Sequence, residues 1–365
     1  MAYYGINAAE QGLIVTMQAV GSLSAAIFIA LKGEKYNKIN FIAFGILIIS
    51  VISLFIGGAP VYAALLALII IFGFGISSVD IMMSGMLADT YPKQKNTLLP
   101  VVHGFGAVGA MFTPVFVALT VDPLYPSSFV NSFRFLCAIA GGIFLLYLIS
   151  SRRIMKETPF VNMEAMRNRA VENPAEIFKT KRAWYLFVVG FLYCTFQYGL
   201  TMWLPTFAIR NAGAEFETGA LMLTVFFAGS MSMRFLTPLF LRRISASNMY
   251  AYFSWAGVAA MLLVLFSQSI PQMFIFIAAC GFLQGGNIGL FVLMCCNTFP
   301  ERTASASSIL ALSFGIAALT IPYLMGLISE YVGFRIPMVL IIIALFASAA
   351  MIFFMRKERA AGLPG

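Results

Sequence analysis

The chain has 365 residues, of which 61% are hydrophobic and 10% are charged. A soluble domain usually carries about 25% charged residues, and no soluble fold buries this much apolar surface, so most of the chain must lie in lipid. The formal net charge of +9 does not by itself indicate binding to nucleic acid, because basic residues in a membrane protein gather in the loops that stay in the cytoplasm.

A helix crosses a bilayer with about 20 consecutive apolar residues. We predict an all-α membrane protein with eleven such helices, near residues 11–31, 39–58, 61–90, 97–121, 128–150, 183–209, 216–241, 248–267, 271–299, 304–329 and 335–355. The one long polar stretch, 151–182, is predicted to be a cytoplasmic linker with room for a short surface helix. It separates a bundle of five helices at 1–150 from a bundle of six at 183–365.

Basic residues indicate how the chain is oriented in the membrane. Nearly all of the 23 lysines and arginines fall in the linker, in one set of alternate loops and in the C-terminal tail, whereas the opposite loops hold only Arg210 and Arg335. Because basic loops stay in the cytoplasm, we predict a multi-pass protein of the plasma membrane, the inner membrane in a bacterium, with a cytoplasmic C-terminus. We expect the protein to be surrounded by the lipid bilayer and to bind no nucleic acid.

An internal repeat relates the two bundles. The residues Gly21–Ser24 recur as Gly229–Ser232, and at the same offset of 208 residues Gly73–Phe74 recurs as Gly281–Phe282. Applied to the predicted helix at 183–209, this offset points to a position before Met1. We therefore expect an ancestor with six helices in each half, of which this chain lacks the first.

One carboxyl group lies within the apolar part of a predicted helix. Asp80 is about ten residues from the cytoplasmic end, which corresponds to a depth of about 15 Å. A charged Asp there costs about 2.5–3.5 kcal/mol, so it must be protonated, paired or exposed to a water-filled cavity. Such a group can exchange protons with a solute pathway. The alternative is a structural hydrogen bond to Ser84 or to a neighbouring helix.

His103 is the single histidine of the chain and is predicted to lie about 9 Å deep in the following helix. It is a candidate to share a proton with Asp80, to bind a substrate hydroxyl, or only to pack. A single histidine is too few for a His-based metal site. The five cysteines lie in apolar stretches without metal-binding or redox spacing. We expect no metal and no other cofactor.

Polar side chains near aromatic rings are candidates to bind the substrate. Proteins commonly hold a sugar with amides that bind its hydroxyl groups and rings that cover its C–H face. The candidates of this kind are Gln197, Tyr198, Trp203, Gln284 and Asn287. The alternative is that the amides only join helices, since an amide in lipid needs a partner.

The two-bundle organisation, with parallel repeats and a long cytoplasmic loop, resembles the major facilitator superfamily. In that superfamily the loop after the second helix carries the pattern G-x-x-x-D-R-x-G-R, and the matching stretch here is Ala30–Lys38. Glu34 occupies the Asp position, and Lys35 and Lys38 occupy Arg positions. The second-half counterpart contains Arg234, Pro238 and Arg242. The resemblance implies gating roles for Glu34, Lys35, Arg234 and Arg242, although snorkelling to the headgroups is an equal alternative for Arg234.

A narrower likeness is to the fucose permease-like branch. Asp80 and Ser84 fall on an acid and an Asn of its fourth helix, and a further set falls on its fifth helix: His103, Phe105, Gly109 and Pro114. Gln197 replaces a Glu of its seventh helix, where Gly199 and Trp203 match. The resemblance implies proton-coupled sugar transport at the membrane midplane.

The combined prediction is a secondary transporter, not an enzyme, that moves a small polar solute, most simply a sugar, with a proton by alternating access. Asp80 and His103 would be the proton-coupling residues. A drug–proton antiporter of the same superfamily, a membrane-embedded enzyme and a truncated, non-transporting membrane protein are the alternatives.

Overall fold

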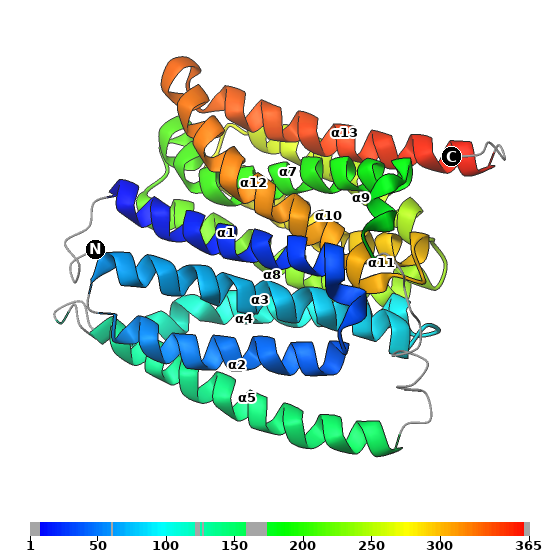
Figure 1. The fold of residues 1–365 in the computed structure, drawn as a ribbon. Coiled ribbons are helices and arrows are strands. Elements are labelled where there is room, and N and C mark those ends of the chain that lie inside the picture. The colour runs from blue at the N-terminus through cyan, green and yellow to red at the C-terminus, as the bar shows by residue number, and fades with distance from the viewer. Residues whose placement is uncertain (1–7, 60, 121–124, 126–127, 158–173, 361–365) are drawn as a thin grey trace. The chain divides into compact units, whose positions relative to one another are not determined.

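The structure is a computed structural model that describes residues 8–59, 61–120, 125, 128–157 and 174–360. All regular secondary structure in these residues is helical (Figure 1). Ten of the described helical segments are long and apolar enough to cross a membrane. At the position of the remaining predicted span, 97–121, the chain forms a further helix of 26 residues. The all-α prediction is therefore confirmed.

The helices lie close to their predicted bounds. The first half contains α1 (Ala8–Lys32), the 3₁₀ helix η1 (Gly33–Lys35), α2 (Lys38–Gly57), α3 (Tyr62–Thr90), α4 (Lys95–Thr120) and α5 (Phe129–Glu157). A second 3₁₀ helix, η3 (Pro174–Lys179), precedes the second half. That half contains α7 (Lys181–Ala212), α8 (Phe216–Leu241), α9 (Ala246–Leu265), α10 (Ile270–Gly285), α11 (Asn287–Thr298), α12 (Thr303–Val332) and α13 (Arg335–Ala360).

The membrane span predicted at 271–299 is confirmed as Ile270–Thr298, with a one-residue turn at Gly286 between α10 and α11. The span predicted at 128–150 is confirmed as Phe129–Ser151, and beyond it α5 continues as a helix through polar residues to Glu157. Helix length depends on backbone hydrogen bonding, whereas our sequence estimate followed apolar composition alone. Residues 158–173, which hold most of the predicted linker, lie outside the described residues.

The helix bounds follow the repeat. The helices α1, α2 and α3 begin at Ala8, Lys38 and Tyr62, and 208 residues later α8, α9 and α10 begin at Phe216, Ala246 and Ile270. The helix α3 ends at Thr90, and α11 ends at Thr298, again at this offset. The repeat therefore holds for the folded elements. The turn at Gly286 has no counterpart, because the equivalent Ser78 lies inside the uninterrupted α3.

Contacts divide the chain into two compact units. One unit comprises 1–92, 112–179 and 299–315, and the other comprises 93–111, 180–298 and 316–365. The beginning of α12 thus belongs to the unit that holds most of the first half, and the beginning of α4 belongs to the other unit. The domain boundaries predicted near 150 and 183 follow the repeat and stay a prediction.

Glycines allow two helices of each unit to approach closely. In the first unit, a Cβ atom at Gly73 of α3 would collide with the Gln18 carbonyl oxygen of α1. In the second unit, a Cβ atom at Gly281 of α10 would collide with the Phe226 carbonyl oxygen of α8. Gly73 and Gly281 are equivalent in the repeat, so both bundles use the same small-residue contact, which is common between membrane helices.

The close contact at Gly73 gives a stability prediction. Gly73→Ala should lower the melting temperature of the detergent-solubilised protein, because overpacking at such a site costs about 1–3 kcal/mol. The control is Gly142→Ala on α5, where an added Cβ would meet no atom within 4 Å. It should leave the melting temperature unchanged or slightly raised, since Ala favours helix over Gly. Equal effects of the two substitutions would contradict this account of the α1–α3 contact.

Candidate functional site

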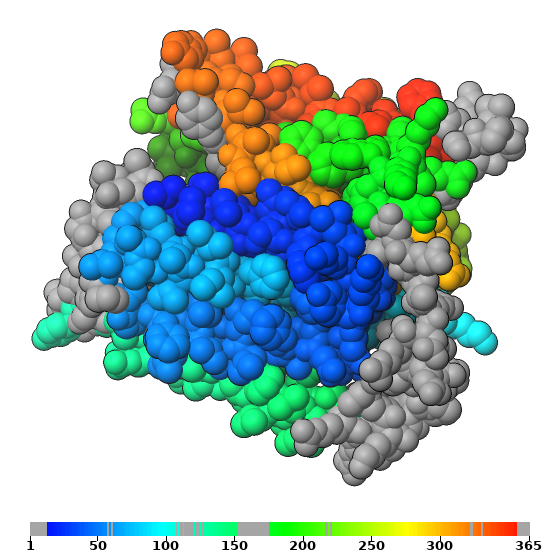
Figure 2. All heavy atoms as spheres, viewed as in Figure 1, coloured from blue at the N-terminus to red at the C-terminus, as the bar shows by residue number. Residues whose placement is uncertain are grey.

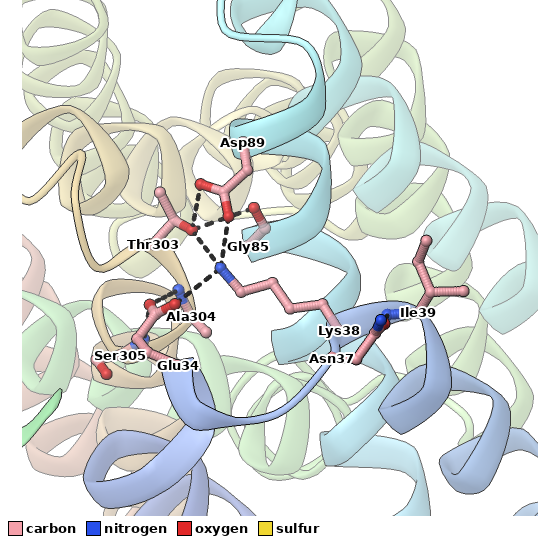
Figure 3. A network of polar contacts seen from close by, with 9 residues as sticks. All are labelled: Glu34, Asn37, Lys38, Ile39, Gly85, Asp89, Thr303, Ala304 and Ser305. Atoms are coloured by element: carbon pink, nitrogen blue, oxygen red, sulfur yellow. Dashed lines mark hydrogen bonds and ion pairs between the residues drawn. The ribbon is translucent and has the colours of Figure 1, made fainter. Parts of the chain in front are cut away.

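A buried polar network joins the turn after α1 to the beginning of α12 (Figure 3). Glu34 of η1 accepts hydrogen bonds at Oε1 from the backbone N–H groups of Ala304 (2.7 Å) and Ser305 (3.2 Å). These groups belong to the first turn of α12, where N–H groups have no partner within the helix. The carboxylate therefore caps α12 and interacts favourably with the positive end of its dipole.

Lys38, the first residue of α2, supplies the positive charge of the network. Its ammonium group lies 2.9 Å from Glu34 Oε2 and 2.5 Å from Asp89 Oδ2, and it donates a hydrogen bond to Thr303 Oγ1 (3.0 Å). Only 3% of Lys38 is exposed. The side chain of Asn37 caps α2 by accepting from Ile39 N (3.0 Å), which fixes where α2 begins and so the direction from which Lys38 enters the network.

Asp89 and Thr303 complete the network. The Thr303 hydroxyl donates to Asp89 Oδ1 (2.7 Å), and the Gly85 carbonyl oxygen lies 3.2 Å away as an alternative acceptor. A Cβ atom at Gly85 would lie 3.0 Å from the Ala304 Cα, so α3 and α12 nearly touch here. We call Glu34, Lys38, Asp89 and Thr303 the clasp. It holds the beginning of a second-half helix on helices of the first half.

Burial makes the clasp sensitive to the loss of any charge. A buried ion pair gains little net stability, because desolvation offsets the attraction, but removal of one partner strands the other charge and costs about 3–5 kcal/mol. Within the clasp one ammonium faces two carboxylates, and the dipole of α12 offsets the excess negative charge. Such an arrangement suits a contact that forms as a whole and separates as a whole.

A second contact lies close to the clasp, at the end of the linker. Glu176 of η3 forms an ion pair with Arg302, with 2.6 Å between Glu176 Oε2 and Arg302 Nη2. The hydrogen bond and the charge of Arg302 lower the pKa of Glu176 below its ordinary value. The neighbouring Ile177 is only 1% exposed. The described end of the linker is therefore packed on this unit.

The pKa of Glu176 predicts a pH effect. A lowered pKa in the folded state stabilises the fold above the ordinary pKa of Glu, near 4.3, and the stabilisation is lost as the pH falls through the lowered value. The melting temperature of Glu176→Gln should therefore lie slightly below that of the parent at pH 7, and the gap should close as the pH falls below about 4. Arg302→Gln should show the same gap, and the double variant no larger one. A gap independent of pH would contradict the ion pair.

In the second unit, Arg234 of α8 connects the beginning of α4 with the end of α10. Its Nη1 donates to the His103 carbonyl oxygen (2.7 Å) and its Nε to the Gly285 carbonyl oxygen (3.0 Å). Gly285 is the last residue of α10, where the backbone oxygens carry partial negative charge. Arg234 therefore bonds at the point where α10 and α11 divide, and it takes part in helix contacts rather than reaching out to the headgroups.

The predicted substrate amides Gln284 and Asn287 lie on either side of this division and are buried. Gln284 Nε2 donates to the Phe253 carbonyl oxygen (3.0 Å), and Asn287 Nδ2 donates to Gln284 Oε1 (2.7 Å) and Ser254 Oγ (2.9 Å). Each of these bonds joins α10 or α11 to its neighbours or to each other. The arrangement is that of a structural network around Gly286.

Three predicted substrate residues on α7 are less buried. Gln197, Tyr198 and Trp203 are each partly exposed. Gln197 Oε1 lies 3.4 Å from the hydroxyl of Tyr193, and Trp203 packs against Phe334 with ring centroids 5.7 Å apart. The remaining predicted gating residues, Lys35 and Arg242, are exposed.

Asp80 lies on an exposed position of α3, and Ser84, one turn further along, is buried. Gly33, just after the end of α1, lies beside Met82, because a Cβ atom there would be 3.3 Å from the Met82 Cε. Asp80 is therefore close to the level at which α1 ends, since α3 continues beyond α1. His103 belongs to the other unit, so a meeting of Asp80 and His103 stays a prediction.

Sequence reasoning identified parts of the clasp but not the whole. It placed Glu34 and Lys38 in a gating loop, and their spacing of four residues is a detectable signal for an ion pair on one helical turn. Asp89, which lies near the end of α3, is a partner of Lys38. Thr303 was not singled out, and no local pattern identifies it. Among the described residues, no group of three or more His, Cys, Asp and Glu side chains is placed to hold a metal ion.

The repeated apolar helices define a multi-pass membrane protein. The sequence profile of the Major Facilitator Superfamily matches residues 1–254 and 220–365, and the chain belongs to this family.

Curated relatives are similar to the chain over most of their length. The chain is 20% identical to the inner membrane transport protein YdiM of Escherichia coli over 328 residues, which cover 89% of this chain and 79% of that protein. It is also 20% identical to the uncharacterized MFS-type transporter YfkL of Bacillus subtilis over 334 residues, or 90% and 82% of the two chains.

Solved structures share the fold. The transporter FucP in the outward conformation superposes with a TM-score of 0.78 at 15% identity, covering 97% of this chain and 92% of that one. The human organic anion transporter MFSD10 superposes with a TM-score of 0.73 at 13% identity, covering 94% and 83%. At these identities the likeness shows the fold alone.

Proposed function

We propose that the chain is a secondary active transporter of a bacterial inner membrane that moves a small polar solute, a sugar, together with a proton by alternating access. The clasp is the observation that carries this proposal. It is a buried set of charges that holds α12 by side chains of the first half. The fold likeness to FucP, which is described as a fucose:proton symporter, supports the choice of a sugar.

Alternating access assigns a role to each clasp residue. In this family type the two halves move about a site near the midplane, so contacts between first-half and second-half helices on the closed side must separate when that side opens. Glu34 caps α12, Lys38 neutralises Glu34 and Asp89, and Thr303 orients Asp89. Arg234 performs the related task for α4 through the His103 carbonyl oxygen. We place the clasp, and with it the C-terminus, on the cytoplasmic side because the basic loops lie there.

Proton coupling is assigned to Asp80, with His103 as its expected partner. Asp80 lies on an exposed position of α3 and not in a sealed contact, as a proton carrier requires. For the substrate, the partial exposure of Gln197, Tyr198 and Trp203 supports direct contact. Gln284 and Asn287 are assigned a supporting role, because their amides already bind Phe253, Ser254 and each other.

Uptake by proteoliposomes tests the function. An inward proton gradient should drive accumulation of at least one sugar from a panel of radiolabelled hexoses and pentoses, and a proton uncoupler should abolish it. The control is the same preparation with Lys38→Met, which should not accumulate the sugar. Efflux of a lipophilic cation driven by protons, with no sugar uptake, would instead favour the drug–proton antiporter. Binding without translocation would favour a non-transporting protein.

A further inference from the structure

A cavity with aromatic walls lies in the first unit, around the turn that joins α1 to α2. Its volume is about 460 Å³, and its walls include Phe28, Tyr36, Phe41, Phe44 and Phe74. This volume falls within the range of about 300–1,000 Å³ that is usual for sites of small organic ligands. None of these residues belongs to the clasp, so the cavity is a separate feature of the same turn.

The rings support one another and fix the shape of the cavity. The ring of Phe28 lies 5.5 Å from that of Tyr36 and 6.4 Å from that of Phe74, measured between centroids, and Phe41 and Phe44 are 6.2 Å apart. Tyr36 is 44% exposed and Phe44 is 51% exposed, so these two rings stand where the cavity opens. Tyr36, with an apolar ring and a polar hydroxyl group, is of a type enriched at the membrane interface.

Two lysines lie close in the chain to residues that line the cavity. Lys32 follows Phe28 by four residues and therefore lies on the same face of α1, and Lys35 directly precedes Tyr36. Both lysines are exposed, whereas Lys38 is buried in the clasp. The turn therefore presents two positive charges outward beside the cavity and directs the third inward.

At Phe44 the cavity borders an apolar surface. Exposed residues follow one face of α2 at helical spacing, namely Phe44, Leu47, Val51 and Leu54, each at least 39% exposed. The elements α1, η1 and α2 lie at the front of the space-filling view (Figure 2). An apolar stripe of this kind on a membrane helix faces acyl chains. The cavity thus lies where an apolar helix face meets a basic turn.

We propose that this cavity binds an anionic phospholipid, with one acyl chain between the rings and the phosphate group beside Lys32 and Lys35. Basic pockets next to apolar helix surfaces on the cytoplasmic side suit such head groups. The polar side chain of Asn40, which also lines the cavity, faces the ester region of the lipid. Because Glu34 and Lys38 belong to the same turn, a bound lipid holds the turn in the geometry that the clasp requires.

Native mass spectrometry of the detergent-solubilised full chain tests the site without reference to transport. Dioleoyl phosphatidylglycerol and dioleoyl phosphatidylcholine are titrated separately, and retained lipid is counted. The parent should retain the anionic lipid preferentially. Lys32→Gln with Lys35→Gln should weaken its retention about tenfold or more, since each basic residue near a lipid surface contributes on the order of a factor of five. Retention of the zwitterionic lipid should not change.

Two further variants separate a site from a general charge effect. Lys93→Gln with Lys95→Gln removes the same charge from another basic loop and should leave retention unchanged. Asn40→Trp fills the cavity without removing charge and should reduce retention as strongly as the Lys32 and Lys35 pair. The proposal is overturned if the two lysine pairs behave alike, if Asn40→Trp has no effect in a protein that elutes normally, or if both lipids are retained equally. Because sugar uptake is not measured, these outcomes are independent of the proposed transport function.

Discussion

Lys38→Met is expected to open the clasp and to abolish accumulation of solute. The substitution keeps the length of the side chain but leaves the buried carboxylates of Glu34 and Asp89 without their cation, at a cost of about 3–5 kcal/mol to the closed clasp. Electrostatic repulsion then favours separation of α12 from α3. The same substitution removes the hydrogen bond to Thr303, so the clasp keeps only the Glu34 cap and the hydrogen bonds that Thr303 donates.

A cysteine reporter measures this opening directly. Ser305 is 0% exposed, and its hydroxyl has no hydrogen-bond partner, so Ser305→Cys removes no bond. In the Lys38→Met background the reporter should react with a membrane-impermeant maleimide about tenfold faster or more. A factor of ten corresponds to about 1.4 kcal/mol, which is less than the cost of about 3–5 kcal/mol expected for the closed clasp. Lys93→Met is the control, because Lys93 is an exposed lysine outside the clasp, and it should leave the labelling rate unchanged.

A charge-balanced variant distinguishes a clasp from a fold that simply fails. Lys38→Met combined with Asp89→Asn leaves one carboxylate, which still caps α12, and should recover a substantial part of the slow labelling. If labelling stays fast in the double variant, or if Lys38→Met labels no faster than its parent, the charges do not hold α12. In that case Lys38 would be only a packing residue, and the proposed gating role would be lost.

Asp80→Asn is expected to abolish proton-driven accumulation while preserving exchange. Asn has nearly the shape of Asp but cannot take up or release a proton, so coupling is lost and solute equilibrates instead of accumulating. In proteoliposomes the variant should show normal sugar counterflow without a gradient and no accumulation under an inward proton gradient. We expect accumulation to be lost completely, because a variant without its proton carrier cannot couple solute movement to the proton gradient.

Ser84→Ala is the control for the structural alternative. If Asp80 serves only to bond with Ser84, both substitutions should impair counterflow and accumulation alike. Under the proposed role, Ser84→Ala should keep most of the accumulation. Full accumulation by Asp80→Asn would remove Asp80 from the coupling mechanism, and loss of counterflow by that variant would assign it to the fold.

The sequence predicted local features well. Each described helix begins and ends within a few residues of an apolar run, except where α5 continues through polar residues to Glu157. The repeat related Gly73 to Gly281, and both form the same close helix contact, because a missing side chain at the same place in two copies has the same packing effect. The division at Gly286 was not predicted, since an apolar run with glycines is compatible with a continuous helix.

The candidate site was predicted only in part. A loop pattern indicated Glu34 and Lys38, but it did not distinguish the buried Lys38 from the exposed Lys35. The amides Gln284 and Asn287 were selected by residue type and aromatic neighbours, yet their bonds to Phe253 and Ser254 depend on how α9 approaches α10 and α11. Residue type shows what a side chain can bind, and packing decides what it does bind.

The sequence by itself determined that this chain crosses a membrane as two related sets of helices, because apolar runs, basic loops and a constant offset are properties of neighbouring residues and of copies. Only the tertiary structure decided that Glu34 caps α12, 270 positions away along the chain, and that Lys38 turns inward to Asp89 while Lys32 and Lys35 stay outside. The reason is physical: a buried charge takes its partner from whichever helix end comes within about 3 Å, and that approach is set by the packing of whole helices.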